Sequence, residues 1–283
     1  MSTTTCPTPT TGSAQPATTP VLRPPDGRAG LAVSAAAVAG RTVRKFWRTP
    51  QLIVVSALTS VMFLLIFRYV FGGAIHAGRL PYADYLIPAM AAGTGLFASG
   101  AVGVADDIET GLFDRLRSLP IPRSAPLVGR CLADTILVAW ATLITVVVGY
   151  ATGFRPHAGV ASTFAALGLC LLFGAAFSWV MIFIGLVAGS TQAAQGMSFL
   201  TFPFVFVSSA YVPVHSMPGW MQPVAANQPF TLMVGAVRAL TVGPGAGALL
   251  GHSPEWFVIR ALAWTVGIIA VFAPLSARRF ARP

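Results

Sequence analysis

Charged residues are scarce in this sequence. Only 9% of its 283 residues are Asp, Glu, Lys or Arg, and 55% are hydrophobic, whereas a soluble domain carries about a quarter charged residues. A chain with so few charges cannot cover a folded surface with polar groups. We therefore expect the outer surface to face lipid, and the fold class predicted is an all-α polytopic membrane protein.

Several kinds of binding site are disfavoured by the residues that are rare or dispersed. The net charge is +10, but the basic residues stand singly between long apolar runs and do not form the patch of a nucleic-acid-binding protein. The three cysteines are scattered, which argues against a disulfide framework and a thiolate metal site. No two of the four histidines have metal-ligand spacing, so we expect no metal.

The motifs of an enzyme are also missing. The one lysine, Lys45, follows Arg44, so the sequence has no Gly-Lys-Ser/Thr of a P-loop. It has no Gly-x-Ser-x-Gly elbow and no zinc-protease motif. None of the eight acidic residues falls in the middle of an expected span, which disfavours an ion-coupled carrier. We expect a chain that is not an enzyme and that takes energy, if it drives transport, from a partner.

Long apolar segments predict six transmembrane helices, because about 20 apolar residues cross the hydrocarbon core. The expected spans are residues 51–71, 83–105, 131–150, 162–188, 195–212 and 256–275. The second span carries Gly95, Ser99 and Gly103 at four-residue spacing, which lets another helix approach closely. Residues 1–30 are expected to be a disordered tail, and residues 31–283 to form the transmembrane domain.

An amphipathic helix is predicted before the first span, over residues 31–49. Its two faces are formed by Arg41, Arg44, Lys45 and Arg48 on one side and by Val43, Phe46 and Trp47 on the other. This pattern is typical of a helix that lies in the membrane interface with its cationic side toward anionic headgroups. The alternative is an ordinary cationic flank of the first span. Pro50 ends the helix.

The distribution of basic residues predicts the orientation. Thirteen lie in the tail, the 31–49 helix, the segment 106–130 and the C-terminus, and five lie in the remaining segments. By the positive-inside rule the first group is cytoplasmic. An even number of spans agrees, because it places both termini on the cytoplasmic side.

Residues 106–130 contain the densest mixture of charges. Acidic residues come first, Gly111 can break the helix, and Leu112, Leu116 and Leu119 then recur on one face. A short amphipathic helix of this kind is suited to dock in a groove of another protein. A solvated loop that merely connects two spans explains the pattern equally well.

This loop resembles the cytoplasmic loop of type-2 ABC exporter permeases, in which an acidic residue, a Gly and a charged Leu-rich turn ending at Pro form the coupling region. The matching residues are Glu109, Gly111, Asp114, Arg115, Leu116 and Pro120. The sequence departs from the family where an Arg-Glu pair often precedes the Gly, because Ile108 and Thr110 stand there. The resemblance implies an ATPase-coupling role for this set together with Asp107 and Arg117.

A second segment, residues 212–240, resembles the part before the last span in permeases of the daunorubicin/doxorubicin-resistance type. Such segments form short re-entrant helices on the outer side. The residues that carry the match are Pro218, Trp220, Asn227, Gln228, Pro229 and Arg238. The stretch Arg48-Thr49-Pro50-Gln51 also resembles the entry to the first span of these permeases.

The resemblance implies a permease subunit of an ATP-driven exporter in the bacterial plasma membrane. Two such permeases pair, as a homodimer or a paralogous heterodimer, and each binds a cytoplasmic ABC ATPase that holds ATP and Mg. The cargo would be a hydrophobic or amphipathic compound, drug-like or lipid. The alternatives are a lipid or glycan exporter of the same family, a non-transporting membrane assembly subunit and a passive pore.

Overall fold

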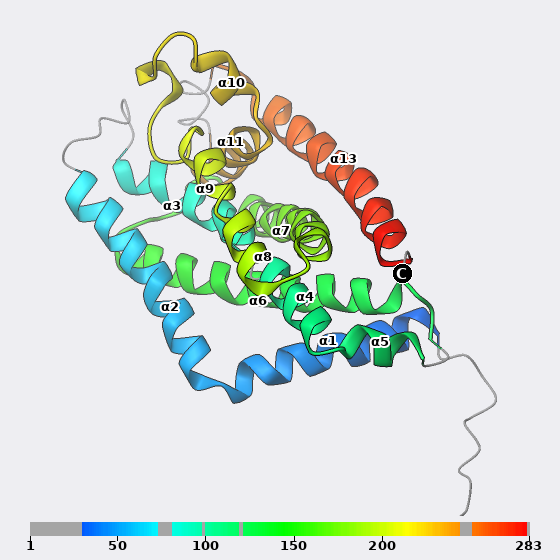
Figure 1. Ribbon diagram of the computed structural model, residues 1–283. Coiled ribbons are helices and arrows are strands. Elements are labelled where there is room, and N and C mark those ends of the chain that lie inside the picture. Colours follow the sequence, from blue (N-terminus) through cyan, green and yellow to red (C-terminus); the bar gives the residue numbers. More distant parts are fainter. Residues whose placement is uncertain (1–29, 73–80, 98–99, 119–120, 244–250, 282–283) are drawn as a thin grey trace, which may run out of the picture.

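The structure is a computed structural model that describes residues 30–72, 81–97, 100–118, 121–243 and 251–281, and all regular elements in these ranges are helices (Figure 1). Five helical stretches of the described chain are long and apolar enough to cross a membrane. They cover residues 53–70, 82–109, 125–151, 160–188 and 254–281. The all-helical prediction is therefore confirmed, and the count of six spans stays a prediction.

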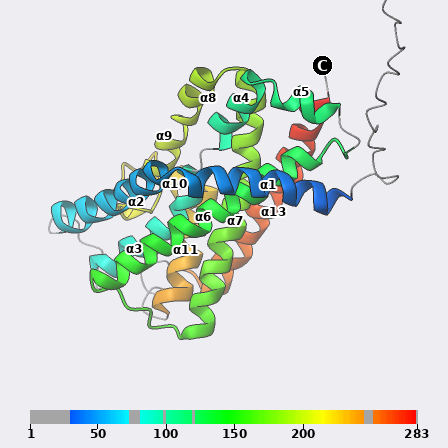
Figure 2. The ribbon, with the colours of Figure 1, turned by 90° about the horizontal axis from the view of Figure 1, so that it is seen from below.

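The first two helices follow one another along one side of the bundle (Figure 2). Helix α1 (Leu31–Arg48) packs along α6 (Ala125–Ala151). The backbones come close at Gly129, where a Cβ atom would lie 2.6 Å from the carbonyl oxygen of Ala35. Helix α2 (Pro50–Leu65) begins with a proline at its first position, where the missing N–H costs nothing, and continues as the π-helix η1 (Ile66–Phe71).

The next segment is bent rather than continuous. It consists of α3 (Tyr82–Gly93), the 3₁₀ turn η2 (Thr94–Phe97) and α4 (Gly100–Glu109), and the short helix α5 (Leu112–Arg117) follows. Helix α5 and α1 lie along the lower edge of Figure 1, and α10 lies at the upper edge. The long helices α7 (Val160–Ala188) and α13 (Pro254–Ala281) complete the bundle.

The expected helix over residues 195–212 differs from the structure. Two short helices, α8 (Thr191–Ser198) and α9 (Thr201–Phe206), replace it, and the following residues form turns. The break has a physical cause in Pro203, because a proline ring clashes with the carbonyl four residues earlier, here that of Phe199. The segment is therefore broken near its middle, and its role as a fifth span stays a prediction.

The segment before the last helix contains the 3₁₀ turn η3 (Val214–Ser216), α10 (Gln222–Asn227) and α11 (Pro229–Val242). Helix α11 is buried on nearly all sides between α3, α7 and α13. The apolar piece that the sequence indicates over residues 230–240 thus lies inside the bundle. Its re-entrant character with respect to a bilayer stays a prediction.

Candidate functional site

Two acidic residues at the end of α4 form ion pairs with α1. A carboxylate oxygen of Asp107 lies 2.9 Å from the Nη2 atom of Arg41, and a carboxylate oxygen of Asp106 lies 3.5 Å from the Nζ atom of Lys45. The cationic face predicted for α1 is therefore divided. Arg44 and Arg48 are exposed, whereas Arg41 and Lys45 bind the acidic residues of α4.

Asp107 also connects the loop to the interior of the bundle. Its second carboxylate oxygen lies 3.8 Å from the Nη1 atom of Arg130, and the Nε atom of Arg130 lies 3.2 Å from Asp134. Ser178 of α7 donates a hydrogen bond of 2.9 Å to Asp134. Alternating charges on α1, α4 and α6 thus run from the surface to a serine on α7.

Asp134 lies in the first half of α6 and is 1% exposed, so an acidic side chain is buried within one of the long apolar helices. The sequence reasoning missed Arg130, Ser178 and Thr191 as parts of this site. A signal was present in the sequence, because Arg130 and Asp134 stand four residues apart and face each other on a helix. Two glycines of α4, Gly100 and Gly103, leave room for this pair, since a Cβ atom at either position would collide with it.

Glu109, the last residue of α4, binds the start of α8. Its carboxylate accepts hydrogen bonds from the backbone N–H of Thr191, at 2.8 Å, and from the Thr191 hydroxyl. The first N–H groups of a helix have no partner within the helix and carry a partial positive charge, so a carboxylate there is stabilising.

Gly111 separates α4 from α5, as the sequence predicted, and has the left-handed φ of +66° that favours glycine. Within α5, Phe113 is buried with its ring edge-on to Phe280 at 5.0 Å, and Leu116 packs in the same cluster. Part of the apolar face of α5 is therefore used inside the chain, whereas Arg115 is exposed.

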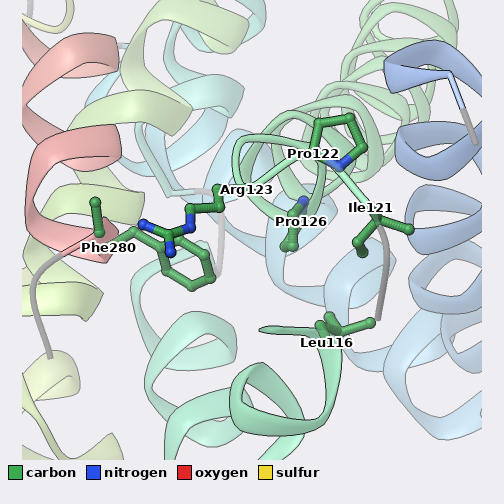
Figure 3. Close-up of a pocket in the computed structure, with 7 residues that line it drawn as sticks. Leu116, Ile121, Pro122, Arg123, Pro126 and Phe280 are labelled. Carbon is green, nitrogen blue, oxygen red and sulfur yellow. The ribbon is translucent and has the colours of Figure 1, made fainter. Parts of the chain in front are cut away.

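Some of the residues assigned to the coupling loop lie beyond the structural description. Pro120 is outside the described residues, and the side chains of Asp114 and Arg117 are not described. Beside α5 is a hollow of about 310 Å³ between the turn before α6 and the end of α13 (Figure 3). Its lining is mainly apolar, with Leu116 and Phe280 on it and the cation Arg123 at the turn.

At the other end of the bundle, Arg238 of α11 holds three segments together. Its guanidinium donates to the carbonyls of Tyr85, at 2.9 Å, Ser209, at 2.8 Å, and Ala210, at 3.0 Å. It also lies over the Tyr85 ring, with 3.5 Å from Cζ to the ring centroid. Because Arg238 is 2% exposed, it acts as a pin between α3, the turn after α9 and α11.

The other residues predicted for the outer segment connect fewer parts of the chain than Arg238 does. Gln228 donates a hydrogen bond of 2.6 Å to the carbonyl of Val207, and Pro229 opens α11 at its first position. Asn227 donates to the carbonyl of Pro223 in its own helix. Pro218 precedes α10, and Trp220 is 75% exposed. The structure thus brings Arg238 and Gln228 together on the turn after α9 and leaves Trp220 and Asn227 at the surface.

The small residues of the second span meet different partners. At Gly95 a Cβ atom would lie 2.5 Å from the Cα atom of Gly174, so α7 approaches η2 through a pair of glycines. Gly103 faces Arg130. Ser99 is outside the described residues.

Residues 34–242, which include α1, the charged loop and α11, match the family described as ABC-2 type transporter. The chain belongs to the ABC-2 type transporter family. The matched part holds every residue of the charge network and of the Arg238 pin described above.

Among ABC-2 relatives, one that is 30% identical over 243 residues is the "daunorubicin resistance ABC transporter permease protein DrrB1" of Streptomyces coeruleorubidus. The alignment covers 85% of this chain and 83% of the relative. Another, 29% identical over 81% of this chain and 82% of its own length, is the "probable doxorubicin resistance ABC transporter permease protein DrrC" of Mycobacterium tuberculosis. The sequence-based resemblance to this type of permease is confirmed.

Proposed function

We propose that this chain is the membrane permease of an ATP-driven exporter that moves a hydrophobic or amphipathic compound out of the cytoplasm or the inner leaflet. A separate cytoplasmic ATPase with bound ATP and Mg supplies the energy, and a second permease completes the path. Both termini lie in the cytoplasm of a bacterial cell. Membership of the ABC-2 family and relatives named for daunorubicin and doxorubicin resistance support this proposal.

The observation that carries the proposal is the chain of ion pairs at Asp107. One carboxylate binds Arg41 on α1 and Arg130 inside α6, and Arg130 continues to Asp134. A force applied to the loop is therefore transmitted to α1 and α6 rather than being lost in a flexible connector. A loop that merely joins two spans needs no ion pair with a cation as little exposed as Arg130, because such a pair is costly to desolvate.

The face offered to the ATPase is the charged side of α5. Phe113 and Leu116 pack inside the chain, so exposed cations such as Arg115 remain for recognition. The outer segment that Arg238 holds would close the opposite end of the path. In this mechanism ATP-driven closure of the ATPases pushes on residues 106–123 and on α1, and the helices rock about the packed core.

Charge reversal at the loop tests this function. The tagged permease is purified in mild detergent, and bound proteins are identified by mass spectrometry. We expect a P-loop ATPase in roughly equal amount with the wild type. The variant Arg115→Glu/Arg117→Glu should recover about tenfold less, which corresponds to about 1.4 kcal/mol of lost attraction.

The matched control is Arg155→Glu, because Arg155 is exposed and lies in the loop between α6 and α7. It should recover the ATPase like the wild type, and all variants should reach the membrane in equal amount. If the wild type recovers no ATPase, the exporter proposal is contradicted, and a passive pore or an assembly subunit is favoured. Equal recovery by the double variant would remove the docking role of α5.

A further inference from the structure

A cavity of about 350 Å³ lies between α2 and the rest of the bundle. On the α2 side it is lined by Ser56, Ser60 and Phe63, and on the opposite side by Thr94 of η2 and Thr145 of α6. Ligand pockets typically begin at about 300 Å³. The cavity is therefore large enough for two or three rings of a small molecule.

Helix α2 has two chemically different faces, one with apolar side chains and one with hydroxyl groups. Val55, Leu58 and Met62 are each more than half exposed on one face. The hydroxyl-bearing residues lie on the face that lines the cavity. The Ser56 hydroxyl donates to the carbonyl of Ile53, and that of Thr145 to the carbonyl of Ala141, which leaves both oxygens free to accept from a ligand.

Tyr211, in the turn after α9, also lines the cavity. It is 6% exposed, and its ring is stacked on that of Phe67 with 4.4 Å between centroids. Its hydroxyl group forms no hydrogen bond with the residues that the structure describes. A tyrosine hydroxyl can donate one hydrogen bond and accept another, so a polar group in the cavity would pair with it.

Charged side chains are absent from the described lining of the cavity. Placing an ion there would strip its water and offer no counter-ion, which costs several kcal/mol. An amine cation or a phosphate is therefore rejected. Aromatic rings from Phe63 and Tyr211 offer stacking surfaces for a flat apolar group.

We propose that this cavity binds the uncharged, ring-containing part of an amphipathic compound that carries hydroxyl or carbonyl groups. The site lies within one permease subunit, between α2, η2, α6 and the turn after α9. That the bound compound is also the transported one rests on the proposed function. Binding itself does not, because all the groups that make the site belong to this chain.

The proposal differs from occupation by a lipid tail. A hydrocarbon chain makes no hydrogen bond, so it would leave the Tyr211 hydroxyl unpaired and gain nothing from the serines and threonines. A ligand that uses these groups should bind more tightly than its methyl analogue. A single net hydrogen bond of about 1 kcal/mol corresponds to roughly a fivefold preference.

Photo-labelling in lipid nanodiscs tests the site on the full-length permease. Three matched probes differ in one group: 4-(hydroxymethyl)benzophenone, 4-methylbenzophenone and 4-(aminomethyl)benzophenone, the last a cation at neutral pH. Insertion sites are mapped by peptide mass spectrometry. We expect saturable labelling by the hydroxymethyl probe in the stretches around residues 56–63, 90–94 and 141–145, roughly fivefold less by the methyl probe and least by the cation.

Two variants and a control locate the binding. Ser60→Leu fills the cavity and should abolish saturable labelling. Ser60→Ala/Thr145→Val keeps the shape, removes two hydroxyls and should reduce the preference for the hydroxymethyl probe over the methyl probe to near unity. Leu58→Ala changes the lipid-facing side of the same helix and should label like the wild type.

The proposal is overturned if labelling does not saturate, if the methyl probe labels as well as the hydroxymethyl probe, or if Ser60→Leu has no effect. The methyl result would indicate a lipid tail as the occupant. Recovery of the ATPase with the same variants is measured in parallel. Saturable labelling without an ATPase would refute the exporter proposal alone, and an ATPase without saturable labelling would refute the cavity proposal alone.

Discussion

Buried charge is stabilised in two different ways in this bundle. Arg130 has carboxylate partners in Asp107 and Asp134, whereas Arg238 is held by backbone carbonyls and an aromatic ring. Removing one partner of a buried ion pair destabilises the protein, because the other partner stays buried and charged without compensation. The two cations therefore respond differently to substitution of their neighbours.

Removal of Asp134 should destabilise the protein strongly. Asp134→Ala leaves Arg130 with one distant carboxylate, and we expect a loss of about 3 kcal/mol in the free energy of unfolding. Arg130→Met/Asp134→Leu should regain part of it, since apolar residues of similar volume often replace a buried pair. The measurement is the unfolding midpoint in detergent at one scan rate.

The control is Asp106→Ala, which removes one partner of an exposed ion pair. It should change the free energy of unfolding by less than about 1 kcal/mol. An equal effect of Asp134→Ala and Asp106→Ala would contradict the assignment.

Close contact of two glycine backbones gives a second prediction at this scale. Gly95→Ala should lower the unfolding midpoint, because its Cβ atom meets the backbone of Gly174, which cannot rotate away. Overpacking of this kind costs about 1–3 kcal/mol. Gly168→Ala on α7 is the matched control, since a Cβ atom there meets no atom within 4 Å. It should be neutral or slightly stabilising, because alanine is the better helix former. A loss of stability equal to that of Gly95→Ala would contradict the assignment to the Gly174 contact.

Among the elements, α8 depends on a residue of another helix for its beginning. The Glu109 carboxylate and the Ser190 hydroxyl each accept a hydrogen bond from a backbone N–H of its first turn. Glu109→Ala should therefore loosen α8 by about 1 kcal/mol. Hydrogen exchange of the amides in residues 191–198 should become about fivefold faster. Glu255→Ala at the start of α13 should leave these amides unchanged, and unchanged exchange in Glu109→Ala would show that the bond does not stabilise α8.

Helices that are apolar throughout were predictable from the sequence, because their length alone identifies them. The stretches at 125–151, 160–188 and 254–281 contain the predicted spans at 131–150, 162–188 and 256–275. Over residues 195–212 the chain is broken between α8 and α9, because the Pro203 ring clashes with the carbonyl of Phe199, and a hydropathy count does not register that break. The predicted tail, residues 1–30, lies almost entirely outside the described residues.

On the scale of the whole molecule, the candidate site was only partly predictable. The acidic residues of the loop and the helix break at Gly111 could be predicted from the sequence of that segment alone. Their partners could not, because Arg41, Arg130 and Thr191 stand 66, 23 and 82 positions from the acids that they bind. Such contacts depend on how α1, α6 and α8 pack around α4, and a periodic pattern within one helix carries no information about that packing.

The Arg238 pin has a consequence for the order in which the protein is made. Its partners Tyr85 and Ser209 precede it by 153 and 29 residues. A ribosome therefore delivers most of the bundle before the side chain that closes its far end. Until Arg238 is added, the carbonyls of Ser209 and Ala210 lack the hydrogen bonds that its guanidinium donates. A chain that ends before residue 238 therefore cannot form these bonds.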